Sequence, residues 1–329
     1  MIKSNPGRGM LYGCLLALVS AGAIAAEQFP TKPVRLLVPY APGGATDITA
    51  RQLAEGLTRT WGQQVIVDNR AGASGNIALE LAARSTPDGY TLFVGNVSTN
   101  AINETTFANA LKIKPSRDLT GVTNLIELPH LWLGSTAAPG NNLKEFVQQV
   151  KSAGTRINYA SAGVGSYPHL DALVLLKATG IQATHIPYKG GAGQMVPAIM
   201  GNEVQFMLMN MASSLSNIKA GRIKALAVTT AERHPELPNV PTSAEMGYAG
   251  MGTNAWNALF APAKLPKPLL SRIHADVYKV MESPEMKASL GKRFMSVVVN
   301  KSPAEFNGFV AAEVKKWGKI VIENNVTVE

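Results

Sequence analysis

Three glycine-containing turns in this chain have the residue types that bind an anion through main-chain N–H groups. They read Pro42-Gly43-Gly44-Ala45-Thr46-Asp47, Ser161-Ala162-Gly163-Val164-Gly165-Ser166 and Tyr188-Lys189-Gly190-Gly191-Ala192. Each lies between a predicted strand and the start of a predicted helix, where unpaired N–H groups and partial positive charge gather. Because glycine lets the backbone approach an anion closely, two such turns, one from each half of the chain, can hold a carboxylate between them.

Each turn also has a purely structural interpretation. A glycine pair is most often only a tight turn, and Asp47 is of a type that satisfies the first N–H groups of a helix. The equivalent positions of the three turns favour a binding site. The segment GVGSYP lacks the third glycine of a dinucleotide-binding turn, and no G-x-x-x-x-G-K-[ST] occurs, so we do not expect a nucleotide.

Catalytic and metal motifs are sparse. The five histidines show no H-x-x-x-H or H-E-x-x-H spacing, which argues against zinc. No G-x-S-x-G elbow appears, and the sequence shows no convincing pair of nucleophile and base. We therefore expect a protein that is not an enzyme and has no cofactor or metal. His169 follows the second turn, where a ligand contact and a structural role both stay open.

Other polar and aromatic residues follow predicted strands. Asn96, Ser98 and Thr99 come after the strand at 90–96 and offer polar contacts. The segment FMLMN places Met209 and Asn210 at the end of a strand, near the expected cleft, although most of its methionines are expected in the core. Trp256 is either a core residue or a wall of the ligand site.

The first 26 residues have the pattern of a secretory signal peptide. Lys3 and Arg8 precede an apolar stretch that ends in Ala23-Ile24-Ala25, a small-residue cleavage site. A membrane anchor is the alternative, but the stretch is short for a span. Cys14 precedes most of the apolar stretch, so LYGC is a poor lipobox, and the mature chain has no cysteine. Removal of two basic residues from a net charge of +9 leaves 9 − 2 = +7, without a basic stripe typical of nucleic-acid binding.

Strands and helices alternate twice along the mature chain, as in a parallel sheet with crossover helices. Residues 32–40, 63–70 and 90–96 read as strands of the first series, and a second series starts after residue 142. We predict an α/β protein of two lobes, each a mostly parallel sheet flanked by helices. Ligands of such sheets bind at the carboxyl ends of the strands, where the glycine turns fall.

Several long segments resemble one known family. FPTKPVRLLVPYAPGGATDITAR, VDNRAGASGNIALELAARSTPDGYTLFVGN, INYASAGVGSYPHL, HIPYKGGAGQMVPAIMGNEVQFM, IKAGRIKALAVTTAERHPELPNVPTSAEMGY and FAPAKLPKPLLSRI are similar, in this order, to the Bug (Bordetella uptake gene) or TctC-type receptors. These are periplasmic solute-binding proteins of tripartite tricarboxylate transporters. The resemblance covers essentially the whole mature chain.

This resemblance implies a two-lobed Venus-flytrap fold in the periplasm. We expect a first lobe from residues 27–125 and 250–329, a second from 126–249, and hinges near 125 and 250. It implies a carboxylate held largely by main-chain N–H groups and water from residues 40–47 and 161–166. It also implies a monomer that does no catalysis, binds no nucleic acid and delivers a small organic acid to membrane permease subunits.

Departures from the family pattern bear on the ligand. Many relatives read roughly V-D-L-M-F-D-N where this chain reads VQFMLMN, so Gln205 and Met209 replace two acids. Without the acid at 209 a natural partner for a ligand ammonium is missing. We therefore expect a carboxylate without an amine, such as a dicarboxylate or an aromatic acid.

The candidate ligand-binding residues are those of the turns, of the segment after residue 96, and of the far end of the pocket. They are Tyr40, Pro42, Gly43, Gly44, Ala45, Thr46, Asp47, Asn96, Ser98, Thr99, Ser161, Ala162, Gly163, Val164, Gly165, Ser166, His169, Pro187, Tyr188, Met209, Asn210 and Trp256. Two other functions stay open: a ligand sensor that acts on a membrane histidine kinase, and an exported hydrolase.

Overall fold

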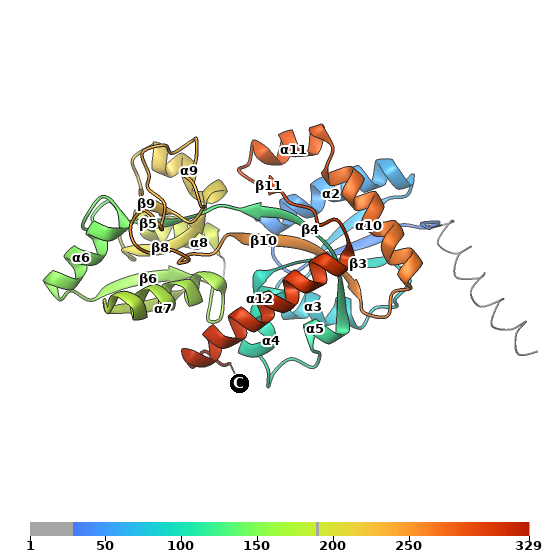
Figure 1. Cartoon of the computed structure of the whole chain (residues 1–329), viewed down its shortest axis with the longest axis horizontal. Coiled ribbons are helices and arrows are strands. Elements are labelled where there is room, and N and C mark those ends of the chain that lie inside the picture. The colour runs from blue at the N-terminus through green and yellow to red at the C-terminus, as the bar shows by residue number, and fades with distance from the viewer. Residues whose placement is uncertain (1–28, 189–190, 329) are drawn as a thin grey trace, which may run out of the picture.

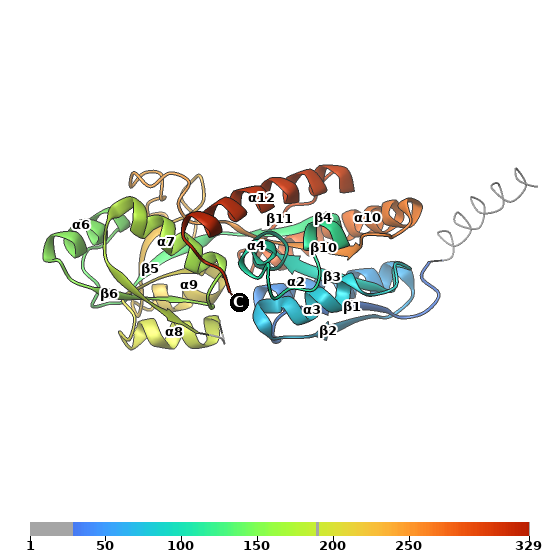
Figure 2. The ribbon, with the colours of Figure 1, turned by 90° about the horizontal axis from the view of Figure 1, so that it is seen from below.

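The structure, a computed structural model, describes residues 29–188 and 191–328. These residues form two α/β lobes, each built around its own sheet (Figures 1 and 2). The predicted signal peptide, residues 1–26, lies outside the described part of the chain. None of the helices that the structure describes has the length and apolar content to cross a bilayer.

The first lobe has a six-stranded sheet in the order β11-β4-β10-β3-β1-β2. Its strands are β1 (Val34–Val38), β2 (Val65–Asn69), β3 (Thr91–Asn96), β4 (Leu119–Leu128), β10 (Ala255–Pro262) and β11 (Ser296–Val297). β1 pairs in parallel with β2 and β3, whereas β10 runs antiparallel to β3 and β4. The sheet is therefore parallel on one side and antiparallel on the other.

Helices cover this sheet and extend toward the second lobe. They are α2 (Ala45–Trp61), α3 (Asn76–Ala83), α4 (Asn103–Thr106), α5 (Pro115–Asp118), α10 (Lys267–Met281), α11 (Pro284–Gly291) and α12 (Pro303–Glu323), with the short turns η1 (Ala73–Gly75) and η2 (Ser98–Ile102). α12 begins directly after Ser302, whose Oγ accepts the N–H of Glu305 at 3.2 Å. α12 lies against β4 and α4 and reaches α7 of the second lobe (Figure 1).

The second lobe has a five-stranded sheet in the order β7-β6-β8-β5-β9. Its strands are β5 (His130–Gly134), β6 (Ile157–Ser161), β7 (Ala183–Pro187), β8 (Phe206–Asn210) and β9 (Lys224–Val228), and its helices are α6 (Leu143–Ala153), α7 (Tyr167–Thr179), α8 (Ala192–Met200) and α9 (Met211–Lys219). β6 is parallel to β7 and β8, and β5 is antiparallel to β8 and β9. α6 and α7 end at Gly154 and Gly180, and both glycines adopt the left-handed conformation that commonly ends a helix.

The predicted α/β class and two-lobed arrangement are confirmed, but the sheets are mixed rather than mostly parallel. The difference arises from β4, β5 and β10, which enter their sheets antiparallel to a neighbour. β4 and β5 were absent from the sequence prediction because only Pro129 separates two apolar runs there, without an intervening helix or glycine turn. The chain passes between the sheets at Pro129 and again between Val228 and Ala255. Lobe boundaries at 125 and 250 remain a proposal.

Apolar side chains on the two faces of β8 fill two different cores. Phe206 and Leu208 pack in one cluster with Trp132, whereas Met207 and Met209 pack in another with Leu131. The alternation expected from FMLMN is present. Met209 is only 5% exposed, so its side chain belongs to the core rather than to an open cleft.

Trp256 is a core residue of the first lobe. It is 2% exposed and packs between β10 and α12, with its ring centroid 5.7 Å from that of Phe309 and 6.3 Å from that of Phe306. Its indole N–H donates to Glu313 Oε2 at 3.2 Å. Of the two possibilities raised by the sequence, the structure supports a core role, and the ligand wall is not seen.

The change Trp256→Ala is expected to lower the free energy of unfolding by about 3–5 kcal/mol, because it empties a large buried volume and removes one of the two indole donors to Glu313, the other being Trp317. Urea unfolding followed by circular dichroism measures the loss. Trp61, which is half-buried, is the matched control and is expected to lose less on substitution by Ala. Equal losses at the two positions would show that Trp256 is not packed as described.

Buried titratable groups lie in the second lobe and at its connection to the first. Burial lowers the pKa of His130, His169 and His185 to about 4 in each case, and the neighbouring His185 adds to the effect on His169. Burial raises the pKa of Asp171 to about 7, against the hydrogen bonds that Thr253 donates from its N–H and hydroxyl at 3.0 and 3.1 Å. At neutral pH the histidines are neutral.

Between pH 6.5 and 4 the unfolded histidines bind protons that the folded ones do not. These histidines therefore cause no loss of stability above pH 6.5. As the pH drops from 6.5 toward 4, the free energy of unfolding falls by at most about 1.4 kcal/mol per pH unit for each fully buried histidine. Asp171 has the opposite effect: because its pKa is raised in the folded state, its protonation between about pH 7 and 3.8 increases the stability. His185 contributes less to the loss than the other two histidines, because it is half-buried.

We expect a net loss of stability from pH 7 to pH 4.5, measured by urea unfolding at both pH values. The variant Asp171→Asn removes the opposing group and is expected to make the loss steeper. A stability that is flat or rises on acidification would contradict the burial of the neutral histidines.

Candidate functional site

The first glycine turn connects β1 to α2 and is held in place by Asp47. Gly43 adopts φ +94°, a conformation that favours glycine, and its N–H donates to Asp47 Oδ2 at 2.9 Å. The same carboxylate accepts hydrogen bonds from Arg51 Nε at 3.0 Å and from Asn69 Nδ2 at 2.9 Å. Burial acts to raise the pKa of Asp47, but these hydrogen bonds outweigh it and hold the pKa below its ordinary value.

Asp47 is therefore ionised, 3% exposed and committed to partners within the first lobe. The structural interpretation of the sequence had assigned Asp47 to the first N–H groups of α2, but in the structure it accepts the N–H of Gly43 and so shapes the turn. Direct contact between its side chain and a ligand has no geometric support here, because both carboxylate oxygens are engaged.

The first N–H groups of α2 are available for an anion. Gly44 is the N-cap residue and has no side chain to cap the helix, and the first intrahelical bond runs from Ile48 N to Gly44 O at 2.9 Å. None of the described residues accepts a hydrogen bond from the N–H of Ala45, Thr46 or Asp47. A Cβ added at Gly43 or Gly44 would meet no atom within 4 Å, so the space in front of the turn is open.

The second turn connects β6 to α7 and is held by three side chains. The N–H of Gly163 donates to Ser161 Oγ at 3.1 Å, and Ser166 Oγ donates to Gly163 O at 2.7 Å. The N–H of Gly165 donates to His169 Nδ1 at 3.2 Å. Gly163 has φ +124°, and a Cβ there would meet nothing within 4 Å. Ala162 and Val164 are exposed beside it.

Two stacked histidines, His169 and His185, contact the second turn. The ring centroids of His169 and His185 lie 4.1 Å apart, and His185 also stacks on Tyr159 at 5.0 Å. His185 Nε2 is 2.6 Å from Ser161 Oγ. His169 is thus a positioning residue for the turn, and His185 is a partner that sequence reasoning missed, because only the pairing of β6 with β7 brings it next to Tyr159.

The second turn lies against the first lobe. A Cβ added at Gly165 would lie 2.4 Å from Thr106 Cγ2, so only glycine permits this approach to α4. Tyr167, the first residue of α7, packs on cores of both lobes, and the nearby Tyr40 contributes to raising its pKa, after burial and Asp171. Tyr40 follows β1. The second turn therefore contacts α4 of the first lobe, and Tyr167 lies near Tyr40, the residue that precedes the first turn.

A polar cluster follows β3 beside Tyr40. The Tyr40 hydroxyl is 3.3 Å from Oδ1 and 3.2 Å from Nδ2 of Asn96, and Asn96 Oδ1 also accepts the N–H of Thr99 at 3.1 Å. Burial raises the pKa of Tyr40, against hydrogen bonds to Asn96 and Ser98 that lower it. Asn96, Ser98 and Thr99 are buried, so Tyr40 is the member of this cluster that is more exposed.

The remaining candidates lie outside this arrangement or support it indirectly. Asn210 caps α9 by accepting the N–H of Ser213 at 2.9 Å. The Tyr188 hydroxyl donates to Glu203 Oε2 at 3.3 Å. Glu203 precedes β8, whereas Asn210 is the last residue of that strand. Pro187 is exposed and pairs with Ser161 in the sheet, close to the second turn. Pro42 is exposed in the first turn.

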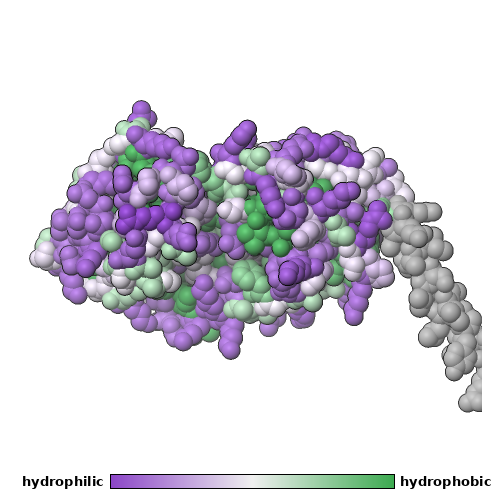
Figure 3. Space-filling model, turned by 45° about the horizontal axis from the view of Figure 1, so that its top comes forward, coloured by the Kyte–Doolittle hydropathy of each residue, from purple (hydrophilic) through white to green (hydrophobic). Residues whose placement is uncertain are grey.

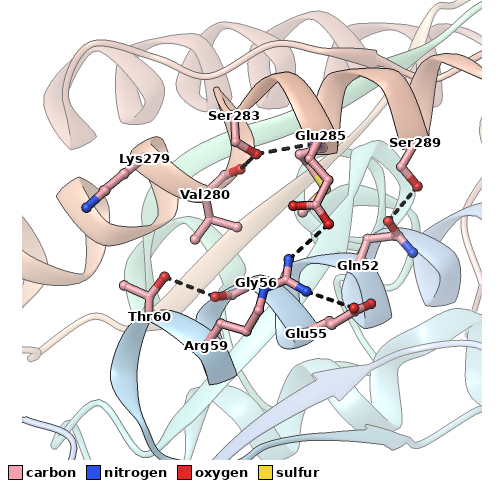
Figure 4. A pocket seen from close by; sticks show the side chains of 11 residues that line it. Gln52, Glu55, Gly56, Arg59, Thr60, Lys279, Val280, Ser283, Glu285 and Ser289 are labelled. Atoms are coloured by element: carbon pink, nitrogen blue, oxygen red, sulfur yellow. Dashed lines mark hydrogen bonds and ion pairs between the residues drawn. The ribbon is translucent and has the colours of Figure 1, made fainter.

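Two surface hollows lie away from the turns. One of about 460 Å³ lies between α2, α10 and α11, where Arg59 forms ion pairs with Glu55 at 2.9 Å and Glu285 at 3.4 Å (Figure 4). Another of about 590 Å³ lies beside α3 and residues 107–112. Neither hollow is lined by a residue of the two turns. On the face shown in Figure 3, a notch in the surface separates the two lobes. Within residues 29–188 and 191–328, no group of three His, Cys, Asp or Glu side chains is arranged to hold a metal ion.

Comparison with known proteins gives consistent matches. BugT of Bordetella pertussis is 29% identical over 94% of this chain and 94% of its own length. Two solved structures are each 30% identical: Rpa4515 of R. palustris with adipate, at a TM-score of 0.83, and MatC of Rhodopseudomonas palustris with bound malate, at 0.79. They cover 91% and 89% of this chain, and 99% and 100% of their own.

A family model described as "Tripartite tricarboxylate transporter family receptor" matches residues 49–326. The match begins within α2, after the first glycine turn, and continues through both lobes to just beyond the end of α12. On this match the chain belongs to the TctC family of receptors, to which the Bug proteins are related.

Proposed function

We propose that this protein is a periplasmic solute-binding receptor that captures a small carboxylate between its lobes and delivers it, chemically unchanged, to the membrane permease of a tripartite tricarboxylate transporter. The observation that carries the proposal is that each lobe presents a glycine turn with open space in front of it, and that Tyr40 and Tyr167, which flank these turns, lie near one another at the lobe junction. The carboxylates printed for the related structures, adipate and malate, support the same ligand class.

The available donors suit one carboxylate group. The first N–H groups of α2 have the partial positive charge of a helix N-terminus, and each hydrogen bond to an ionised carboxylate contributes about 1.5–3 kcal/mol. A few such bonds are enough for micromolar binding, which needs about 8.2 kcal/mol. Donors from both lobes are reached together only when the lobes close, so the ligand favours closure.

The turns offer no carboxylate to a ligand ammonium. Asp47 is the one acid within the described residues of the two turns, and both its oxygens are hydrogen-bonded. Met209 is buried in the core, so the position where many relatives carry an acid supplies none here. These observations support a carboxylate without an amine, a dicarboxylate or an aromatic acid, over an amino acid.

Hydrolysis is the less favoured alternative. Ser161 Oγ and His185 Nε2 lie 2.6 Å apart, which is a distance suited to a nucleophile and its base. However, Ser161 is fully buried and its Oγ also accepts the N–H of Gly163, so the pair holds the turn rather than facing a substrate. Turnover of nitrophenyl esters by the pure protein would favour this alternative.

Sensing through a membrane histidine kinase would use the same ligand site, and it differs from transport only in the partner. Deletion of the permease genes separates the two. Ligand-dependent transcription that survives the deletion would favour sensing.

In a thermal-shift screen of organic acids, we expect at least one dicarboxylate or aromatic acid to raise the melting temperature. A ligand at 100 times its Kd stabilises the native state by about 2.7 kcal/mol. Calorimetry then ranks the hits against glutamate and aspartate. An amino acid as the tightest ligand would contradict the expected ligand class.

The change Gly163→Leu is expected to weaken binding of the best acid by at least about tenfold, since a side chain at φ +124° strains the turn and enters the open space before it. Gly154→Leu is the matched control, because Gly154 also has a left-handed conformation and free space but ends α6, away from the turns. Both variants are expected to lose about 1–2 kcal/mol of stability. Unchanged affinity in Gly163→Leu would remove the second turn from the site.

A further inference from the structure

His130 and Tyr167 form a buried pair where the two lobes meet. His130 begins β5 directly after the chain has left the first sheet, and it is fully buried. Its Nδ1 lies 2.9 Å from Leu128 O, and its Nε2 lies 2.6 Å from the Tyr167 hydroxyl. The two rings meet edge to face, with centroids 5.0 Å apart at 87°.

The contacts of His130 fix the position of each proton. A carbonyl oxygen only accepts hydrogen bonds, so Nδ1 of His130 carries the hydrogen that faces Leu128 O. Burial lowers the pKa of His130 to about 4, so at neutral pH the ring has one proton and Nε2 is bare. The Tyr167 hydroxyl is therefore the donor to Nε2, and its own proton is committed.

With its proton committed, the Tyr167 oxygen can only accept further hydrogen bonds. Burial raises the pKa of Tyr167, so the hydroxyl stays protonated and keeps this role. The neighbouring Tyr40 hydroxyl lies with the Asn96 amide, and no hydrogen bond joins it to Tyr167 among the described residues. Tyr167 is half-buried and directly follows Ser166 of the second turn.

The donors and the acceptor at the lobe junction are therefore of different kinds. The glycine turns present N–H donors, which suit a carboxylate, and the acceptor is the hydroxyl oxygen of Tyr167, the residue that directly follows the second turn. A ligand with a hydroxyl next to its carboxylate matches both. An unsubstituted acid has only a C–H hydrogen where the hydroxyl would donate.

We propose that Tyr167, oriented by His130, is a specificity-determining residue that favours carboxylates bearing a hydroxyl on the adjacent carbon over the same acids without it. This inference rests on the proposed function, because it concerns the same ligand site. One neutral hydrogen bond contributes about 0.5–1.5 kcal/mol, which corresponds to a preference of up to about tenfold.

The test compares matched pairs of acids by isothermal titration calorimetry: succinate with malate, glutarate with 2-hydroxyglutarate, and phenylacetate with mandelate. For at least one pair, the hydroxy acid is expected to bind the wild-type protein more tightly, by up to about tenfold. In Tyr167→Phe the ratio within that pair is expected to fall to about one, while the unsubstituted acid keeps its Kd within about threefold.

Two further variants separate the hydroxyl from general damage. Tyr90→Phe removes a hydroxyl that pairs with Thr31 in the first lobe, and it is expected to leave the ratio unchanged. His130→Phe frees the Tyr167 hydroxyl to turn, and it is expected to reduce the ratio although the hydroxyl remains. A defect of folding alone would weaken both acids of a pair equally and leave their ratio intact.

A wild-type protein that binds the unsubstituted acids equally well, or a preference that survives in Tyr167→Phe, would overturn the inference while the proposed function stands. Failure of all six acids to bind the wild-type protein would contradict the proposed function for both ligand classes, and the inference with it.

Discussion

The carboxylate of Asp47 fixes the part of the molecule on which the proposed site depends. It accepts the N–H of Gly43 and hydrogen bonds from Arg51 and Asn69, so it joins the turn, α2 and β2. Because it takes the N–H of the turn rather than those of the helix, the first N–H groups of α2 stay available. The second turn reaches the same result with neutral acceptors, Ser161 and His169. Both turns are thus shaped before any ligand arrives, which limits the ordering that binding requires.

The groups that hold the glycine turn in place differ in charge between the two lobes. The first turn relies on an ionised acid paired with an exposed arginine, an arrangement that tolerates a wide range of pH. The second relies on histidines that burial keeps neutral, and protonation of His169 at Nδ1 would remove the acceptor for Gly165. The half of the site formed by the second lobe is therefore the more sensitive to acid.

The sequence predicted the positions of the glycine turns between strands and helices better than the contacts around them. Glycines at strand ends are local signals, and the turns at 43–44 and 163–165 were found from them. A structural role for Asp47 was also one of the alternatives, although its partner is the N–H of Gly43 rather than the first N–H groups of the helix. Tyr167 and His185 were missed, because their positions depend on contacts between lobes and between strands that no local pattern contains. From the sequence alone, Trp256 can be a core residue or a wall of the ligand site, because both are compatible with a strand. Its packing against Phe306 and Phe309 shows that it belongs to the core.

The order of strands in the first sheet has a consequence for the assembly of the protein. β10 lies between β3 and β4, although some 130 residues of chain, including the whole second sheet, separate it from β4. When the chain is synthesised from its N-terminus, the second sheet can be completed once residue 228 is present. The first sheet lacks its inner strand β10 until residue 262 is present. Contacts so distant in sequence form slowly. The lobe that begins the polypeptide is therefore the last to be finished, and until then β3 and β4 each expose an unpaired edge to self-association.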